Sequence, residues 1–273
     1  MKYFISVFII INCFISIGQN IQNNLVLNPG FEIYTGLPQV LYASDGISYC
    51  KYWSIPDMGS VDYYNEDNNF APCKRFGKNY PHSGKAYIAI IPIYWNGCME
   101  HITDSLKEPL QKGKKYKVDF YIKYAGDSSY LICSNVGVYF SKNKFPFKSD
   151  ISFYNKIITP DIRAQVQSKT DEFLSDTTWT LISGYFIANG GERYLTLGMF
   201  YNENILTNSI DRFVNYNIDW DSNKRKIRFF KNKYNQKMLK VNPNFKGEIN
   251  YNTKCPYYFI DDVSVVLVED TRK

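Results

Sequence analysis

The feature that most constrains the fold is a set of short segments in which apolar and polar residues alternate. In residues 116–124 the even-numbered positions are apolar or aromatic, and the odd-numbered ones are Lys117, Asp119, Tyr121 and Lys123. Alternation with a period of two is the pattern of a half-buried β-strand. Residues 135–141 repeat it, with Val136, Val138 and Phe140 on one face. Several short strands separated by turn residues predict an all-β antiparallel sandwich.

Further strands are predicted from similar segments, namely 24–27, 86–91, 179–188, 193–201 and 257–268. The high aromatic content, 17%, agrees with this because tyrosine and phenylalanine favour strands. Between 34 and 85 the chain is rich in Gly, Pro, Asn and Asp, which predicts mostly loop. Residues 162–174 suit one or two helical turns. Asn189-Gly190-Gly191 predicts a tight hairpin, and the polar stretch 205–256 reads as an insertion before the last strand.

The N-terminus has the pattern of a secretory signal peptide. Lys2 precedes a mostly apolar run over 3–17, and Ser16-Ile17-Gly18 places small residues before Gln19. We therefore predict a signal peptide over 1–18, a single domain over 19–273, and a secreted or cell-envelope location (periplasm or outer surface). Lipidation at Cys13 is the alternative. No later segment is long and apolar enough to predict a transmembrane span.

The positive charge of the chain is concentrated in one block. The formal net charge is +6, and Lys224–Lys240 holds eight basic residues and no acid, so the remainder carries −2. A local block does not predict a specific nucleic-acid binder. Aromatic residues interleave the block, which suits binding of an anionic polymer such as a polysaccharide, and a solvated hairpin or loop is the alternative.

Five cysteines remain after cleavage of the signal peptide. An odd number in an exported protein suggests up to two disulfides and one thiol. Cys50 and Cys73 flank a loop rich in Gly, Pro and Asn and form the preferred pair. The alternative is that most of the cysteines are buried free thiols.

Three segments together resemble a known family. They are N-L-V-L-N-P-G-F-E at 24–32, W-T-L-I-S-G-Y-F at 179–186 and Y-Y-F-I-D-D-V-S-V at 257–265. The set is similar to the jelly-roll carbohydrate-binding modules of the galactose-binding-like class. With S-Y-C-K-Y-W at 48–53 and G-K-A-Y at 84–87, it resembles the N-terminal module of Bacteroidetes OmpA-like cell-surface proteins. The resemblance implies a jelly-roll sandwich. We expect two departures from the family, the lack of an OmpA-like domain after the module and the 205–256 insertion within it.

A calcium site is predicted where the first and last strands meet. If these strands pair, Glu32 comes close to Asp261, and two carboxylates repel unless a cation lies between them. Ca²⁺ takes about six to eight oxygen ligands, and the resemblance implies that Glu32 and Asp261 supply some of them at a structural site. Strand alternation places Asp262 on the opposite face. The alternative is that Glu32 caps a turn and Asp261 accepts backbone N–H bonds.

Ligand binding is predicted to involve outward-facing aromatic side chains, because sugar rings stack on aromatic faces. The candidate ligand-binding residues are Tyr94, Trp95, Tyr121 and Tyr139. Asp119 and Lys123 share the face of Tyr121, whereas Trp53 and Trp179 are expected in the core. The alternative is that loops cover these outward aromatics.

Catalysis is not predicted. The chain has two histidines, His82 and His101, and neither lies in a metal-binding or nucleophile motif. We therefore expect a non-catalytic lectin-like module that binds a glycan or cell-surface polysaccharide. The alternatives are a structural or adhesion component of the outer surface and a small polysaccharide-active enzyme with two facing carboxylates.

Overall fold

A computed structural model describes residues 23–38, 46–56, 59–68, 79–92, 99–126, 133–144, 162–169, 174–200, 216–218, 227–229 and 256–269. The regular elements over these ranges are one short 3-10 helix and eleven strands. In chain order they are η1 (Gly46–Tyr49), β1 (Asp62–Asn65), β2 (Ala86–Ile90), β3 (His101–Ser105), β4 (Lys115–Tyr124), β5 (Val136–Ser141), β6 (Val166–Gln167), β7 (Thr180–Ile187), β8 (Tyr194–Met199), β9 (Tyr216–Ile218), β10 (Ile227–Phe229) and β11 (Tyr258–Leu267).

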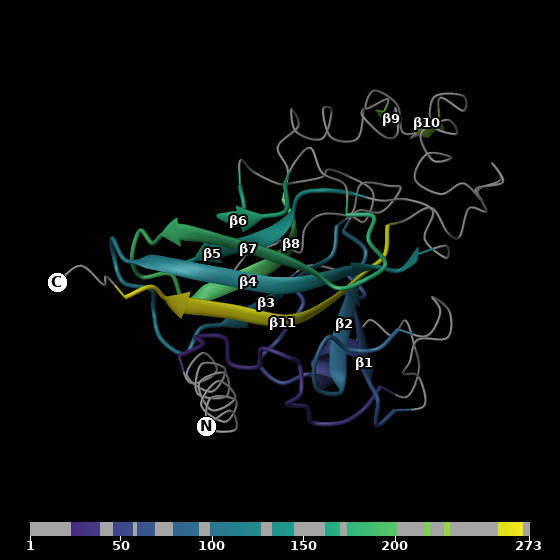
Figure 1. Cartoon of the computed structure of the whole chain (residues 1–273), viewed down its shortest axis with the longest axis horizontal. Helices are drawn as coiled ribbons and strands as arrows, with labels where there is room; N and C mark the ends of the chain where they lie inside the picture. Colours follow the sequence, from purple (N-terminus) through teal and green to yellow (C-terminus); the bar gives the residue numbers. More distant parts are fainter. Residues whose placement is uncertain are drawn as a thin grey trace, which may run out of the picture.

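Two antiparallel sheets form the body of the fold. One has the strand order β1-β2-β11-β4-β7 and the other has the order β3-β8-β5-β6, while β9 and β10 form a separate pair. Figure 1 shows β7, β4 and β11 side by side, with strands of the second sheet behind them. This is the predicted all-β, two-sheet antiparallel jelly-roll β-sandwich. The last strand, β11, lies at the centre of the five-stranded sheet, between β2 and β4.

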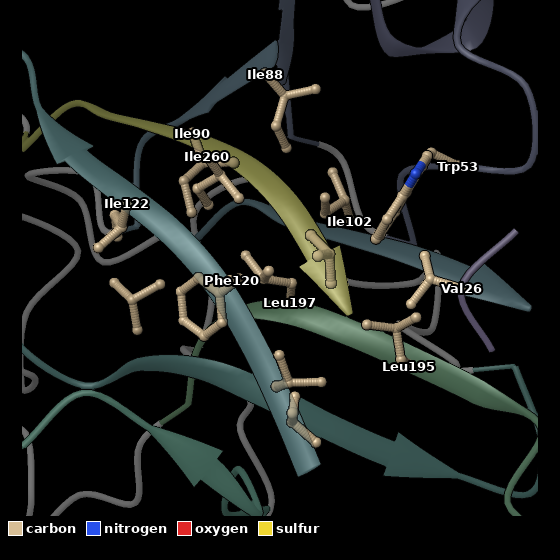
Figure 2. Packing of buried hydrophobic residues seen from close by; sticks show 14 of the residues in the cluster. Val26, Trp53, Ile88, Ile90, Ile102, Phe120, Ile122, Leu195, Leu197 and Ile260 are labelled. Carbon is tan, nitrogen blue, oxygen red and sulfur yellow. The ribbon is translucent and has the colours of Figure 1, made fainter. Parts of the chain in front are cut away.

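The core lies between the two sheets and follows from strand alternation. Along β4 every second side chain is buried, and Phe120 and Ile122 point toward β8, where Leu195 and Leu197 are also buried (Figure 2). Removing such side chains from water contributes about 1.5–3 kcal/mol each. Trp53 closes one end of this core, as expected, and its indole N–H donates to the Asn28 carbonyl at 2.8 Å.

The beginning of the described chain lies against its last strand, as predicted. Leu25 N donates to Val265 O at 2.9 Å, and the Asn24 amide donates to Val263 O at 3.1 Å. The predicted strand over 24–27 is reduced to one isolated bridge, between Val26 and Leu106. Side-chain and backbone hydrogen bonds join this segment to β11 on one side and to Lys107 on the other, in place of a regular strand ladder.

Some local predictions are wrong. β1 forms inside the stretch predicted as loop, and β3 and β6 were not expected. Residues 162–169 hold β6 and no helical turn. The Asn189–Gly191 turn is not a hairpin, because β7 pairs with β4 and β8 pairs with β3 and β5. Gly190 and Gly191 both have positive φ and carry the chain from one sheet to the other.

Several predictions fall on residues that the structure does not describe. They include the signal peptide at 1–18 with Cys13, the residues Cys73, Tyr94 and Trp95, and the 205–256 insertion with its basic block at Lys224–Lys240, apart from the backbone of β9 and β10. Over the described residues, no helix is both long enough and apolar enough to cross a membrane.

Candidate functional site

A bulge in β11 brings two adjacent carboxylates to the same place. The register between β11 and β4 shifts between Asp261 and Ser264, and Asp262 has a φ of 50°. A side chain on Gly30 would meet Asp262 Oδ1 at 3.3 Å and Asp261 Oδ1 at 3.8 Å. The prediction that Asp262 points to the opposite face is therefore wrong, because the bulge interrupts the alternation of side chains.

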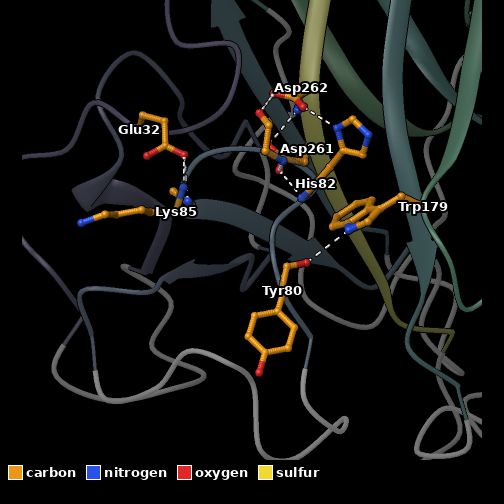
Figure 3. A network of polar contacts seen from close by, with 9 residues as sticks. Glu32, Tyr80, His82, Lys85, Trp179, Asp261 and Asp262 are labelled. Carbon is orange, nitrogen blue, oxygen red and sulfur yellow. Dashed lines mark hydrogen bonds and ion pairs between the residues drawn. The ribbon is translucent and has the colours of Figure 1, made fainter.

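Three acidic residues, Glu32, Asp261 and Asp262, hold one turn of the chain, residues 82–86 (Figure 3). Asp261 Oδ2 accepts from His82 N at 2.8 Å and from Ser83 N at 3.2 Å. Asp262 accepts from the Ser83 hydroxyl at 2.8 Å and lies 2.6 Å from His82 Nδ1.

Glu32 completes this cluster from the N-terminal segment. Its Oε1 accepts from the backbone N–H groups that follow Gly84, at 2.7 and 2.8 Å. Glu32 and Asp261 therefore lie at the same turn, as predicted. Their observed contacts are those of the alternative interpretation, in which both carboxylates accept backbone N–H groups.

Burial and charge make Asp261 an unusual carboxyl group. Its side chain is fully buried, and burial together with the adjacent charge of Asp262 raises its pKa from 3.8 to about 8. The hydrogen bonds from His82 and Ser83 act in the opposite direction and do not offset the burial.

The cluster supplies the kind of ligand that calcium prefers. Carboxylate oxygens of Glu32, Asp261 and Asp262 are hard donors, and a cation would relieve the repulsion between the two adjacent aspartates. Five of the six oxygens already accept hydrogen bonds or face His82. Over the described residues, no group of three or more His, Cys, Asp or Glu side chains is arranged to hold a metal. Backbone carbonyls would therefore have to supply the other ligands.

Tyr121 is on the outer face of the five-stranded sheet, as predicted, but one face of its ring is covered. The His82 ring stacks on it with centroids 3.5 Å apart, and Trp179 meets His82 edge-on at 6.0 Å. Trp179 is half-buried on this outer face, where its indole N–H donates to Tyr80 O. The prediction that Trp179 lies in the core between the sheets is therefore wrong. These contacts leave Tyr121 a smaller stacking surface than the sequence suggested.

The outer face of the five-stranded sheet has a closed half and an open half. Over β1, β2 and the start of β11 it carries a second cluster of buried aromatics, including Tyr64, Tyr87 and Phe259. Over β7 the outward side chains Leu181, Tyr185 and Ile187 are 45%, 54% and 68% exposed. Isolated exposed apolar side chains are common, but three of the four exposed outward positions of β7 are apolar or aromatic, with Ser183 between Leu181 and Tyr185. Exposed apolar side chains gathered on one strand mark a candidate binding surface.

Polar groups on β4 border this patch. The Lys115 ammonium lies 4.6 Å from the centre of the Tyr185 ring, and Lys117 forms a 2.8 Å ion pair with Asp119 Oδ2. The other oxygen, Asp119 Oδ1, is buried and has no hydrogen-bond partner among the described residues. We call Leu181, Tyr185, Ile187 and the outward residues of β4 the open face. Tyr185 was missed by the sequence analysis, although the alternation along β7 would have placed it outward.

The other predicted ligand residues do not join this face. Tyr139 is outward on the four-stranded sheet and packs against Phe200 at 5.8 Å, so it lies on the opposite side of the sandwich from Tyr121. One ligand therefore cannot contact both tyrosines in the same site. Tyr94 and Trp95 lie outside the described residues.

Cys50 is a free and buried thiol in the structure. Its sulfur accepts from the Asn28 amide at 3.3 Å, and burial raises its pKa well above the ordinary value. The predicted partner, Cys73, lies outside the described residues. Cys133 is also free and buried, which agrees with the alternative of buried thiols for both described cysteines.

A scan against protein-family models and a search of curated proteins find no match. Among solved structures, the chain is similar to the CBM22-1 xylan-binding domain of Xyn10C from Paenibacillus barcinonensis, with 12% identity, a TM-score of 0.40 and coverage of 89% of this chain and 93% of that one. It is also similar to the K3 cleaved adhesin domain of Lys-gingipain from Porphyromonas gingivalis, with 13% identity, a TM-score of 0.33 and coverage of 88% and 96%. The fold assignment is made from the strand pairing described above.

Proposed function

We propose that this protein is an exported, non-catalytic carbohydrate-binding module whose ligand lies on the open face. The observation that carries this proposal is the exposed Tyr185 ring, which has the Lys115 ammonium 4.6 Å from its centre and the Lys117–Asp119 ion pair on the neighbouring strand. An aromatic ring stacks on the apolar face of a sugar, and a carboxylate accepts hydrogen bonds from its hydroxyl groups. A glycan supplies both kinds of contact at once.

The geometry of the open face favours binding over hydrolysis. Glycosidases commonly use two carboxyl groups on either side of the scissile bond. Asp119 is the one carboxylate that the described strands β4 and β7 place on this face. It is held by Lys117 in an ion pair, which suits an acceptor of fixed position better than an acid that donates a proton.

The proposal is tested by measuring retention on a panel of soluble polysaccharides in native affinity gels. Tyr185→Ala should weaken binding of the retained glycan by about tenfold or more, because aromatic stacking contributes about 1–3 kcal/mol. Tyr52→Ala is the matched control, since Tyr52 is 49% exposed and lies outside the open face. No retention on any glycan would favour the alternative of a structural or adhesion component without sugar binding. Product release from a polysaccharide would favour an enzyme.

A structural calcium ion is a second part of the proposal. Glu32 and Asp261 would hold it, with backbone carbonyls of the surrounding turns. The support is geometric: the Asp261 carboxyl is buried, its Oδ1 and that of Asp262 both lie close to Gly30, and a cation would relieve the repulsion between the two carboxylates.

Calcium binding is tested by thermal unfolding with EDTA and with CaCl₂, together with elemental analysis of the purified protein. Binding to the folded state alone should raise Tm in a concentration-dependent way. Glu32→Gln should reduce this rise, whereas Glu108→Gln, a control at an exposed carboxylate away from the 82–86 turn, should leave it intact. Equal Tm values with chelator and calcium, and no bound metal, would contradict the site.

We also propose export to the cell envelope, on the basis of the N-terminal segment 1–18 and the resemblance to Bacteroidetes surface modules. Binding of an anionic polymer at Lys224–Lys240 stays a prediction from the sequence. Both are checked by fractionating cells that express the full chain and by comparing glycan retention with and without residues 224–240.

A further inference from the structure

The open face carries more positive than negative charge. Strand alternation along β4 places Lys115, Lys117 and Lys123 on the outer side with Asp119, so three ammonium groups share the surface with one carboxylate. The carboxylates of Glu32, Asp261 and Asp262 lie farther across the sheet, at the 82–86 turn beside β11. The face therefore has a positive potential that an acidic ligand would neutralise.

Two of these lysines are placed to receive an anion. Lys115 Nζ lies over the Tyr185 ring at 4.6 Å, and Lys123 Nζ lies over the Trp179 ring at 5.9 Å. Neither has a carboxylate partner among the described residues, whereas Lys117 is paired with Asp119. Partial burial lowers the pKa of Lys123, which shows that its charge is incompletely solvated.

The spacing of these lysines indicates the size of the ligand. They are eight residues apart on one strand, which is about 26 Å at about 3.3 Å per residue. A single sugar cannot reach both ammonium groups, whereas an extended chain of several sugar units can. A neutral chain would cover the lysines without supplying partners for their charges, which disfavours it.

We propose that the open face binds an acidic polysaccharide, with the carboxylates of its uronic acid units pairing with Lys115 and Lys123 and one sugar ring stacking on Tyr185. This inference rests on the proposed carbohydrate-binding function and deepens it. A single-stranded nucleic acid is less suited to the same face, because successive bases stack on a row of exposed rings, whereas Tyr185 is the one aromatic side chain of β4 and β7 that is more than half exposed.

The test compares two ligands that differ only in charge: oligomers of polygalacturonate and the same oligomers fully methyl-esterified. Titration calorimetry of the full chain at low salt should show at least tenfold tighter binding of the acidic form. That preference should shrink at high salt, because exposed ion pairs are screened. Single-stranded DNA of equal length and dextran sulfate serve as polyanions without carboxylates.

Lys115→Gln and Lys123→Gln should each weaken binding of the acidic oligomer by about 3- to 10-fold. This is the loss expected when one ion pair, either exposed or partly buried, is removed. Lys51→Gln, an exposed lysine outside the face, is the matched control and should change binding less than twofold. Circular dichroism melts of each variant confirm that the fold is retained.

The outcomes separate the inference from the function on which it rests. Equal binding of the acidic and esterified oligomers, or no effect of either lysine substitution, would overturn the inference. If a neutral glycan binds in a Tyr185-dependent way while the acidic oligomer does not, the proposed function stands and the inference fails. Equally tight, lysine-dependent binding of DNA or dextran sulfate would also overturn it, and no glycan binding at all would contradict the proposed function itself.

Discussion

At the scale of single residues, Asp104 is a buried carboxyl group whose backbone hydrogen bonds do not offset the effect of its burial. It is 1% exposed, accepts from Leu27 N through Oδ2, and its Oδ1 has no partner among the described residues. Burial raises its pKa from 3.8 to about 7, so the folded protein holds a proton that the unfolded chain releases at lower pH. Buried unsatisfied oxygens of this kind cost stability.

This shift has a consequence for stability against pH. Between the ordinary pKa and about pH 7 the folded state binds more protons, so the contribution of Asp104 is present at low pH and is lost as pH rises, by about 1.4 kcal/mol per pH unit at most. Asp104→Asn removes this titration. Urea unfolding at pH 5, 6, 7 and 8 should show the variant gaining stability relative to the wild type as pH rises. A difference that does not vary with pH would show that Asp104 is ionised in the fold.

The sequence located the outward residues but not their surroundings. Tyr121 was placed outward by alternation, yet its stacking on His82 depends on a turn 39 positions earlier in the sequence (121 − 82), which no local pattern encodes. Asp262 was assigned to the wrong face because the sequence Asp261-Asp262 does not indicate that β11 has a bulge at this point. Tyr185 was overlooked although its strand was predicted and the alternation along β7 places it outward.

At the scale of elements, the turn over 82–86 joins the N-terminal segment to β11 and leads into β2. Gly84 in this turn has a φ of 60°, and a Cβ there would lie 2.2 Å from Glu32 Oε1. Gly113 also has a positive φ, 75°, but a Cβ there would meet nothing within 4 Å. The two glycines therefore separate backbone strain from the loss of the Glu32 contacts.

We predict that Gly113→Ala lowers the free energy of unfolding by about 1 kcal/mol, the cost of a left-handed alanine. Gly84→Ala should lower it by about 3 kcal/mol or more, because the displaced Glu32 also loses two N–H donors. Urea midpoints at one pH measure both. Equal losses in the two variants would mean that Glu32 contributes nothing to holding the turn.

Strong strands were predictable and weak or interrupted ones were not. β4, β5, β7, β8 and β11 fall within one or two residues of the predicted segments, because each has a clear alternating or continuously apolar pattern. β1 and β3 contain polar residues such as Asp62, Asp104 and His101 that are buried by tertiary contacts. Their burial depends on partners distant in sequence, so local patterns indicated loop.

At the scale of the whole molecule, β11 connects the N-terminal segment at Leu25 with the middle of the five-stranded sheet. Because β11 enters the middle of the five-stranded sheet, the 257–265 segment carries both the core residue Ile260 and the acidic cluster at the bulge. The family resemblance anticipated that Glu32 and Asp261 would meet there. It did not indicate which face of the sandwich would stay open, since exposure depends on how loops cover each sheet.

The central claim is that a glycan binds the open face, and nuclear magnetic resonance of the labelled protein tests it most directly. Titration with the oligosaccharide that is retained most strongly should shift the amide signals of Asp119, Leu181 and Tyr185. The signals of Tyr139, on the opposite side of the sandwich, and of Tyr52 should stay in place. Shifts confined to the four-stranded sheet around Tyr139, with none on β4 and β7, would contradict the account.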